Sequence, residues 1–114
     1  FRYSLMQDAQ QKSTFAKELE LLELYLSIEK VRFGDKLNVT LDIDSNTLAA
    51  QVPTLFLQPI VENAIKYGIE ARKQNGRIVI SAKITEGIIT IIVLFRIDIF
   101  KSVMRILLWY NRTK

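Results

Sequence analysis

Four side chains whose types could do chemistry lie close together in residues 57–68, LQPIVENAIKYG. Glu62 and Asn63 precede Lys66 by four and three positions, so in a helix all three would project from the same turn. Tyr67 lies four positions after Asn63. An amide oxygen can ligate Mg²⁺, an ammonium group can neutralise phosphate, and an aromatic ring can lie against a base. The spacing alone leaves a second interpretation open: a surface Glu–Lys pair beside an asparagine near a helix end.

The composition excludes several other kinds of chemistry. The chain has 114 residues, which is the size of one domain, and it contains neither cysteine nor histidine. Disulfides, thiolate metal sites, Ser-His-Asp catalysis and a phosphohistidine on this chain are therefore excluded. Only four glycines occur, and the closest two, Gly68 and Gly76, are eight positions apart. This spacing allows no glycine-rich phosphate loop.

The net charge of +4 is located almost entirely at the end of the chain. Residues 1–93 contain 11 basic and 11 acidic side chains, whereas residues 94–114 contain five basic and one acidic. The body of the chain thus carries no net charge that would attract a polyanion, and we expect no nucleic-acid partner. Weak nucleic-acid binding by the basic end is the remaining alternative of this kind.

The first element expected upstream of this segment is a helix over residues 14–33. Ser13 or Thr14 can cap its start, and Gly34 ends it. Apolar residues at helical spacing predict its buried face: Phe15, Leu19, Leu22, Leu26 and Ile28. Three glutamates are interpreted as a solvated acidic face rather than a metal site: Glu18, Glu20 and Glu23.

The remaining pattern predicts a strand, a second helix and a hairpin. Residues 37–43 alternate strictly between apolar and polar, and 44–52 form a polar connection. Pro53-Thr54 begin a helix over about 54–68, in which Pro59 makes the first turn irregular and Gly68 ends the element. Strands follow at 77–84 and 88–93, joined by a short glycine-containing turn. This order predicts an α/β sandwich with both helices on one face of the sheet.

Three segments of the chain resemble a known family. The segment VPTLFLQPIVENAIKYGI resembles the asparagine box of sensor histidine kinases, and more narrowly the bacterial subfamily that includes autolysis-regulating sensors. The segment ELELLELYLSIEKVRFGDKLNV resembles the region that precedes the box, and GRIVISAKITEGIITIIV resembles the sheet hairpin that follows it. The likeness covers residues 1–93 in the family's order.

The resemblance implies an α+β fold, the two-layer sandwich shared by histidine kinases, gyrase and heat-shock chaperone ATPases. It implies Mg²⁺ and ATP as ligands in the intact parent. Asn63 would hold Mg²⁺, Lys66 would reach the phosphates and Tyr67 would flank the nucleotide. Glu62, the catalytic candidate, would be a polar helper near the metal or the incoming histidine. The implied partners are the phosphoacceptor helix bundle of the same kinase and a response regulator.

The likeness ends after Val93. The family continues there into an Asp-x-Gly-x-Gly box whose aspartate binds the adenine amino group, whereas this chain has Phe95 and Ile97 at the matching places. The sandwich is therefore expected to be incomplete at its C-terminus and to bind ATP weakly or not at all. A frameshift or chimeric end near residue 94 is our hypothesis. Residues 94–110 have helical spacing and predict a basic amphipathic helix that packs on the core, pairs between chains or lies on a membrane surface; a largely disordered end is the remaining alternative.

Three regions follow from these observations. Residues 1–12 are expected to be the end of an upstream dimerisation helix with a linker, 13–93 a partial histidine-kinase ATP-binding domain, and 94–114 an apolar basic tail outside the family. The expected function is that of a fragment of a two-component sensor kinase whose parent phosphorylates a histidine; whether this chain is itself an enzyme stays open. The alternative is a non-catalytic interaction module that self-associates through residues 94–114. The expected location is the cytoplasmic domain of a membrane-anchored bacterial sensor.

Overall fold

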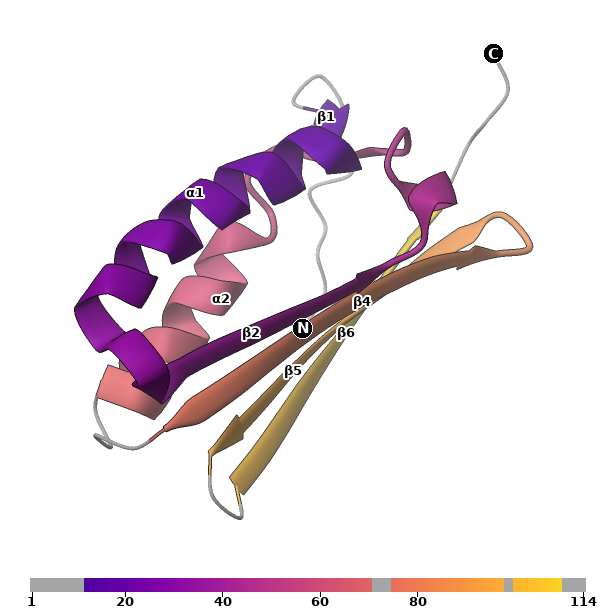
Figure 1. Cartoon of the computed structure of the whole chain (residues 1–114). Coiled ribbons are helices and arrows are strands. Elements are labelled where there is room, and N and C mark those ends of the chain that lie inside the picture. The colour runs from indigo at the N-terminus through magenta and orange to yellow at the C-terminus, as the bar shows by residue number, and fades with distance from the viewer. Residues whose placement is uncertain (1–11, 71–74, 98–99, 110–114) are drawn as a thin grey trace.

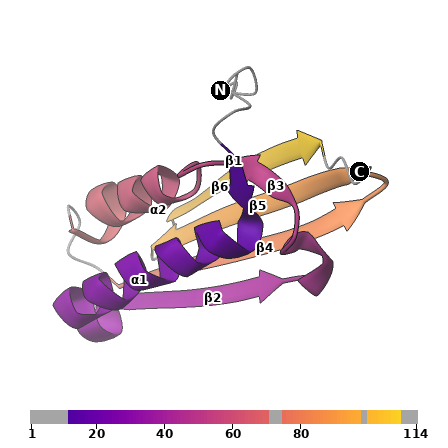
Figure 2. The ribbon, with the colours of Figure 1, turned by 90° about the horizontal axis from the view of Figure 1, so that it is seen from above.

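Two helices cover one face of a four-stranded sheet (Figures 1 and 2). The computed structural model describes residues 12–70, 75–97 and 100–109, with side chains for 12–70 and 75–96. The helices are α1 (Phe15–Phe33) and α2 (Gln58–Ala64). The sheet has the order β2-β4-β5-β6, and its strands are β2 (Leu37–Ile43), β4 (Gly76–Thr85), β5 (Ile88–Ile97) and β6 (Phe100–Trp109). The predicted α+β sandwich is confirmed.

Helix α1 begins and ends where the sequence predicts. The Thr14 hydroxyl accepts a hydrogen bond from the Lys17 N–H at 3.2 Å, and Gly34, at φ 59°, donates its N–H to the Lys30 carbonyl. Two predictions about its faces are wrong. Ile28 is 67% exposed, and Glu18 is buried instead of lying on a solvated face. The other predicted core positions of the helix are buried: Phe15, Leu19, Leu22 and Leu26.

Helix α2 starts later and continues further than predicted. Leu55 has φ 56°, a left-handed conformation that a helix cannot contain, so the helix begins only at Gln58. Pro59 consequently lies in the first turn, where its missing N–H has no helical partner to lose. Gly68 does not end the element, because a π-helical segment, Ile65–Glu70, extends it. Arg32 of α1 reaches this segment and pairs with Glu70 at 2.9 Å.

The sheet combines one parallel pair with two antiparallel pairs. β2 pairs in parallel with β4 in the register Leu37↔Gly76, and β4 pairs antiparallel with β5. The β4–β5 turn is formed by Glu86 and Gly87, whose φ values of 52° and 79° match a two-residue hairpin turn. The hairpin is thereby confirmed. Alternate strand residues enter the core beneath the helices: Ile78, Ile80, Ala82, Ile89, Ile91 and Val93.

A second, small sheet fixes the entry to α1. β1 (Lys12–Thr14) pairs antiparallel with β3 (Gln51–Pro53), two strands that the sequence analysis missed. Phe15 and Ala16 donate their backbone N–H groups to the carbonyls of Ala50 and Leu48, which satisfies donors at the helix start. The predicted polar connection 44–52 is thus partly ordered structure, and Lys12 belongs to a strand instead of a linker. Residues 1–11 lie outside the described residues.

The predicted amphipathic helix over residues 94–110 is wrong. β5 continues to Ile97, and β6 pairs with it antiparallel over ten residues, from Ile97↔Phe100 to Ile88↔Trp109. Alternation of apolar and charged residues from Phe95 onward suits a strand as well as a helix, and a partner strand satisfies the hydrogen bonds of β5. Residues 98–99 and 110–114 lie outside the described residues. Within the described ranges, no helix has the length and apolar character needed to cross a membrane.

Candidate functional site

The face of α2 that carries the candidate residues points away from the sheet. Asn63, Lys66 and Tyr67 are exposed and Glu62 is half-buried. The opposite face is packed against the sheet through Val61 and through the other buried members of this element, Ile65, Gly68 and Ile69. The apolar stripe therefore positions Asn63, Lys66 and Tyr67 toward solvent.

Two of the four candidates are in contact within the π-helical segment. In the first residue of this segment, Ile65, the N–H is shared between the carbonyls of Glu62 and Val61. π-Helical turns are rare and occur often at functional sites. The Lys66 ammonium nitrogen lies 5.3 Å from the centroid of the Tyr67 ring, a cation–π contact. Within the described residues, no hydrogen bond or ion pair joins Glu62, Asn63 and Lys66, so the surface Glu–Lys pair is not formed.

Glu62 is held on the side of α2 nearest to α1. Its carboxylate accepts a hydrogen bond from the Gln58 amide at 2.8 Å, one turn earlier in the helix. Burial raises the pKa of Tyr25, on α1, to about 12, and the negative charges of Glu29 and Glu62 add to the increase. A hydrogen bond thus fixes Glu62 within α2, and its negative charge helps to raise the pKa of Tyr25 on α1.

The donor groups around Asn63 fit a magnesium ion that arrives with a nucleotide. Among the described residues, no group of three or more acidic side chains is placed to hold a metal ion by itself. Mg²⁺ in phosphate-transferring proteins typically uses one or two protein oxygens and completes its shell with phosphates and water. The exposed Asn63 amide offers one such oxygen, whereas a metal held by the protein alone would need more ligands.

The end of β5 does not fit an adenine-binding aspartate. Phe95 is half-buried and packs against the core, close to Ile69 and Gly76. A Cβ added at Gly76 would lie 2.6 Å from Ile69 Cγ1 and 3.3 Å from Phe95 Cε1, which shows how closely these residues pack. An apolar ring offers no acceptor for an amino group. Ile97 continues the strand and pairs with Phe100, so its backbone is extended where the family has a glycine.

Sequence reasoning missed the carboxylate that positions the start of α2. Glu18 is 3% exposed; it accepts a hydrogen bond from the Ser13 hydroxyl at 2.8 Å and another from the Leu55 N–H at 2.7 Å. It thereby links β1 to the turn that leads into α2. A signal was present, since Glu18 falls three positions after Phe15 and four before Leu22, inside the apolar stripe of α1.

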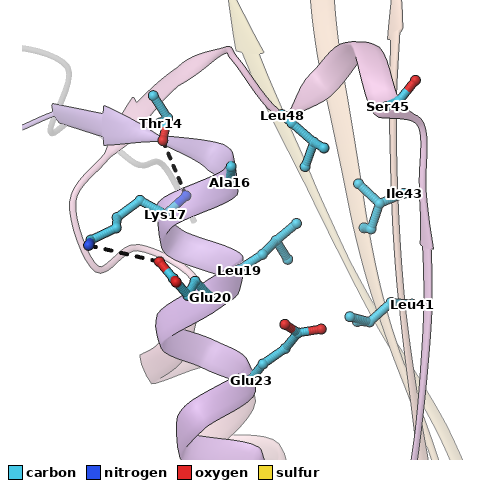
Figure 3. A pocket seen from close by; sticks show the side chains of 10 residues that line it. All are labelled: Thr14, Ala16, Lys17, Leu19, Glu20, Glu23, Leu41, Ile43, Ser45 and Leu48. Atoms are coloured by element: carbon cyan, nitrogen blue, oxygen red, sulfur yellow. Dashed lines mark hydrogen bonds and ion pairs between the residues drawn. The ribbon is translucent and has the colours of Figure 1, made fainter.

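A separate cavity of about 660 Å³ lies between α1 and the β2 side of the sheet (Figure 3). Its floor is apolar, and Glu20 and Glu23 contribute carboxylates from α1. The Glu20 carboxylate is 3.8 Å from the Lys17 ammonium. No residue of α2 lines this cavity, so it is not part of the candidate nucleotide site.

Comparisons with known proteins agree with this geometry. A family model described as "Histidine kinase" matches residues 1–37. The sensor protein LytS of Staphylococcus saprophyticus is 40% identical over 82 residues, which are 72% of this chain and 14% of that protein. The sensor histidine kinase BtsS of Escherichia coli K12 is 46% identical over 70 residues, or 61% of this chain and 12% of that protein.

Solved structures support the same fold. The catalytic domain of the histidine kinase ThkA superposes with a TM-score of 0.56 at 13% identity, covering 76% of this chain and 58% of that one. ThkA in complex with the response regulator protein TrrA gives a TM-score of 0.53 and covers 74% of this chain. The chain spans about an eighth of the length of LytS and BtsS. Over the part that these comparisons match, the chain belongs to the sensor histidine kinase family that includes LytS, BtsS and YpdA, in the region of its ATPase-like catalytic domain.

Proposed function

We propose that residues 13–93 are part of the ATP-binding domain of a two-component sensor kinase whose parent transfers the γ-phosphate of ATP to a histidine. The observation that carries this proposal is the exposed face of α2 and of its π-helical continuation, which presents Asn63, Lys66 and Tyr67 to solvent in a fold of the histidine-kinase type. The family membership of the matched region supports the same assignment.

Each residue on this face would make a different contact with Mg²⁺–ATP. The bound nucleotide would supply the phosphoryl group, and positioning with charge neutralisation is the main contribution of a protein to such a transfer. Asn63 would offer its amide oxygen to the metal ion, and Tyr67 would lie beside the nucleotide. Glu62, held by Gln58, would keep a polar group next to the metal or the acceptor histidine.

Lys66 can leave its contact with Tyr67 for a phosphate. An exposed cation–π contact is worth about 0.5–1 kcal/mol, whereas a hydrogen bond to a charged group is worth about 1.5–3 kcal/mol. The resting position of the ammonium group, 5.3 Å from the ring centroid, therefore opposes phosphate binding only slightly.

We further propose that this chain binds ATP weakly or not at all. Phe95 provides an apolar ring where an acceptor for the adenine amino group is needed, and the extended backbone at Ile97 cannot approach phosphates as a glycine turn does. Loss of these contacts together should weaken binding by several powers of ten. The chain has no histidine, so it cannot phosphorylate itself on that residue.

The partners and location belong to the same proposal. The acceptor would be the phosphoacceptor helix bundle of the same kinase, and the phosphoryl group would pass on to a response regulator. Residues 1–11 would come from the end of the dimerisation helix, which the family match over residues 1–37 supports. The domain would lie on the cytoplasmic side of a membrane-anchored bacterial sensor. The alternative of an interaction module held by residues 94–114 has less support, because residues 100–109 pair with β5 of their own chain.

Calorimetric titration with Mg²⁺ and a non-hydrolysable ATP analogue tests the proposal. We expect no binding in the micromolar range for the unchanged chain, and tighter binding for Phe95→Asp, which adds the acceptor. Phe95→Ala is the matched control, because it opens the same space without an acceptor. Micromolar binding by the unchanged chain would contradict the weak-binding proposal.

A second measurement keeps the test valid if Phe95→Asp does not fold. At millimolar Mg²⁺–ATP, the backbone amide resonances of Asn63, Lys66 and Tyr67 in the unchanged chain should shift, and Asn63→Ala should reduce those shifts. Shifts confined to other parts of the surface would contradict the nucleotide site itself.

A further inference from the structure

The edge of the sheet at β2 presents backbone groups that no described strand satisfies. Among the described strands β2 pairs only with β4, and at the end of this ladder the Asp44 N–H donates to the Ala82 carbonyl at 3.0 Å. Alternate residues of a strand bond to the same neighbour, so the even-numbered residues of β2 face β4. The N–H and C=O groups of Val39, Leu41 and Ile43 therefore point outward from the sheet.

A hydrogen bond from α1 supports this direction of the edge. The Leu37 carbonyl belongs to the same odd-numbered set, and it accepts a hydrogen bond from the Lys30 ammonium at 2.7 Å. Lys30 thus covers one end of the edge and leaves the remainder open. Figure 2 shows β2 at the border of the sheet, with no described element on its outer side. An open edge of this kind is a template for an added strand.

The cavity between α1 and β2 provides space for the side chains of an added strand (Figure 3). Its apolar part is formed by Leu19, Ile43 and Leu48, and Glu23 projects from α1 toward Leu41 of β2. Its volume of about 660 Å³ is in the range of ligand-binding pockets. Alternate residues of a strand point to one face, so two side chains of an added strand, two positions apart, would enter this cavity.

The charges of the cavity favour a basic side chain in one of these two positions. Lys17, Glu20 and Glu23 all line the cavity. The Lys17 ammonium lies 3.8 Å from the Glu20 carboxylate, so these two charges offset one another. Glu23 makes no ion pair with any residue that the structure describes. A carboxylate without a cation, at the side of an apolar cavity, is complementary to a lysine or arginine.

The positions of the apolar part and of Glu23 define a spacing for the two side chains. Glu23 follows Leu19 by four helical residues, a rise of about 6 Å, and Leu41 and Ile43 are two strand residues or about 6.6 Å apart. Both separations match residues i and i+2 of an added strand. Antiparallel pairing is slightly more stable than parallel pairing. A strand antiparallel to β2 would place its aliphatic residue first, beside Ile43, and its basic residue two positions later, beside Glu23.

We propose that β2 and this cavity bind an extended peptide by strand addition, and that the peptide carries an aliphatic residue followed two positions later by lysine or arginine. This site goes beyond the proposed function, because no residue of α2 lines the cavity. A second copy of the chain is a less suitable occupant. A symmetric β2–β2 pair centred at Leu41 would bring the Glu23 carboxylates of the two copies together.

Titration of the chain with a seven-residue probe, acetyl-Thr-Thr-Leu-Thr-Arg-Thr-Thr-amide, tests the proposal. We expect saturable binding with a dissociation constant below about 1 mM. At saturation the N–H groups of Val39, Leu41 and Ile43 should exchange more slowly with solvent, whereas those of the even-numbered residues, which already bond to β4, should change little. Slowed exchange of the same three groups without the probe, at high protein concentration, would assign the edge to a second copy and overturn the proposal.

N-methylated probes test the backbone hydrogen bonds. Opposite an outward-facing residue of β2, an antiparallel peptide residue exchanges both hydrogen bonds with it, so the N–H groups of the probe's leucine and arginine face β2. N-methylation of these two residues should abolish binding. N-methylation of the threonine between them is the matched control, because its N–H points away from β2, and binding should be kept. Equal binding of the two methylated probes would exclude strand addition.

Reversal of charge tests the role of Glu23. Glu23→Lys should weaken binding of the arginine probe by about fivefold, and a probe with glutamate in place of arginine should recover most of this loss. Glu86→Lys, at the exposed β4–β5 turn, changes the net charge equally and should leave the dissociation constant unchanged. Binding that is insensitive to Glu23→Lys, or no saturable binding at millimolar probe, would overturn the proposal. Circular dichroism of each variant establishes that the fold is kept.

Discussion

One buried carboxylate, Glu18, links the strand that precedes α1 to the turn that precedes α2. Its oxygens accept hydrogen bonds from the Ser13 hydroxyl and from the Leu55 N–H, and Leu55 has the left-handed backbone that redirects the chain into α2. Removing the acceptor leaves the part-buried Leu55 N–H without its partner, a loss of about 1–3 kcal/mol. We therefore expect Glu18→Ala to lower the free energy of unfolding by that amount, measured by urea denaturation.

A neighbouring exposed glutamate gives the control for Glu18. Glu20 is exposed and takes part only in a surface ion pair, so Glu20→Ala should change the free energy of unfolding by less than about 0.5 kcal/mol. Equal losses for the two variants would mean that the buried hydrogen bonds of Glu18 do not stabilise the fold.

Tyr25 predicts how stability changes at high pH. Its pKa is raised to about 12 in the folded chain from an ordinary value of 10.0, mainly by burial. The folded state therefore keeps the phenol proton in a range where the unfolded state has lost it, so the stabilisation is complete below pH 10 and is lost as pH rises toward 12.

The urea midpoint, measured between pH 9 and pH 12, should fall over the range between the unfolded and folded pKa values of Tyr25. Tyr25→Phe, which cannot ionise, should reduce the slope over the same range. An identical slope in both proteins would show that Tyr25 ionises equally in the folded and unfolded states. Ultraviolet absorbance of tyrosinate, compared between the same two proteins, gives an independent measure of the pKa.

At the scale of the elements, helix α1 has one face buried in the core and an opposite face that is exposed. Leu22 is buried, and its replacement by alanine should lower the free energy of unfolding by about 2–5 kcal/mol. Ile28→Ala, at an exposed position, should cost less than about 0.5 kcal/mol. A loss below about 1 kcal/mol for Leu22→Ala would contradict the assignment of the buried face.

Elements with strong local signals could be predicted from the sequence alone. Thr14 and Gly34 define the ends of α1, and the alternation from Leu37 to Ile43 defines β2. The hairpin at Glu86-Gly87 follows from a short turn between two β-branched runs. In each case neighbouring residues determine the backbone, so no knowledge of distant contacts is needed.

The incorrect predictions involve contacts between distant residues. Ile28 is the exception: it follows Leu26 by two positions, which places it on the opposite side of the helix from the buried face, and it is exposed there. Glu18 is buried because Leu55, far along the chain, supplies a donor to it. Phe100–Trp109 forms β6 because β5 offers an edge, and apolar residues there suit a strand as well as a helix.

The candidate site could be predicted only in part, because some of its geometry depends on a backbone conformation that the sequence pattern does not reveal. The outward position of Asn63 and Lys66 follows from the apolar stripe of α2, which local spacing reveals. The contact between Lys66 and Tyr67 lies within the π-helical segment, which begins where the helix continues past Ala64. Local spacing does not distinguish such a segment from an ordinary helix, and Gly68 in particular favours an early end.

At the scale of the whole molecule, β6 protects the isoleucine-rich strand β5. The two strands pair over ten residues, and without β6 one side of β5 would present unpaired backbone groups. A chain shortened to end at Ile97 should therefore have a lower urea midpoint and scatter more light on warming. A chain that ends at Trp109 keeps β6 and is the matched control. Equal behaviour of the two shortened chains would show that β6 adds nothing to stability or solubility.

The parallel pairing of β2 with β4 has a consequence for how the chain folds during its synthesis. α1 and β2 leave the ribosome before β4, the only described strand that pairs with β2. Translation of the connecting residues takes a few seconds at about 5–20 residues per second, whereas a hairpin such as β4–β5 forms within about 1–10 μs once both strands are available. The apolar face of β2 therefore stays without its partner strand β4 for far longer than the β4–β5 hairpin takes to form. Nascent-chain folding should begin only when β4 emerges, and a chaperone that shields α1 and β2 would act in that interval.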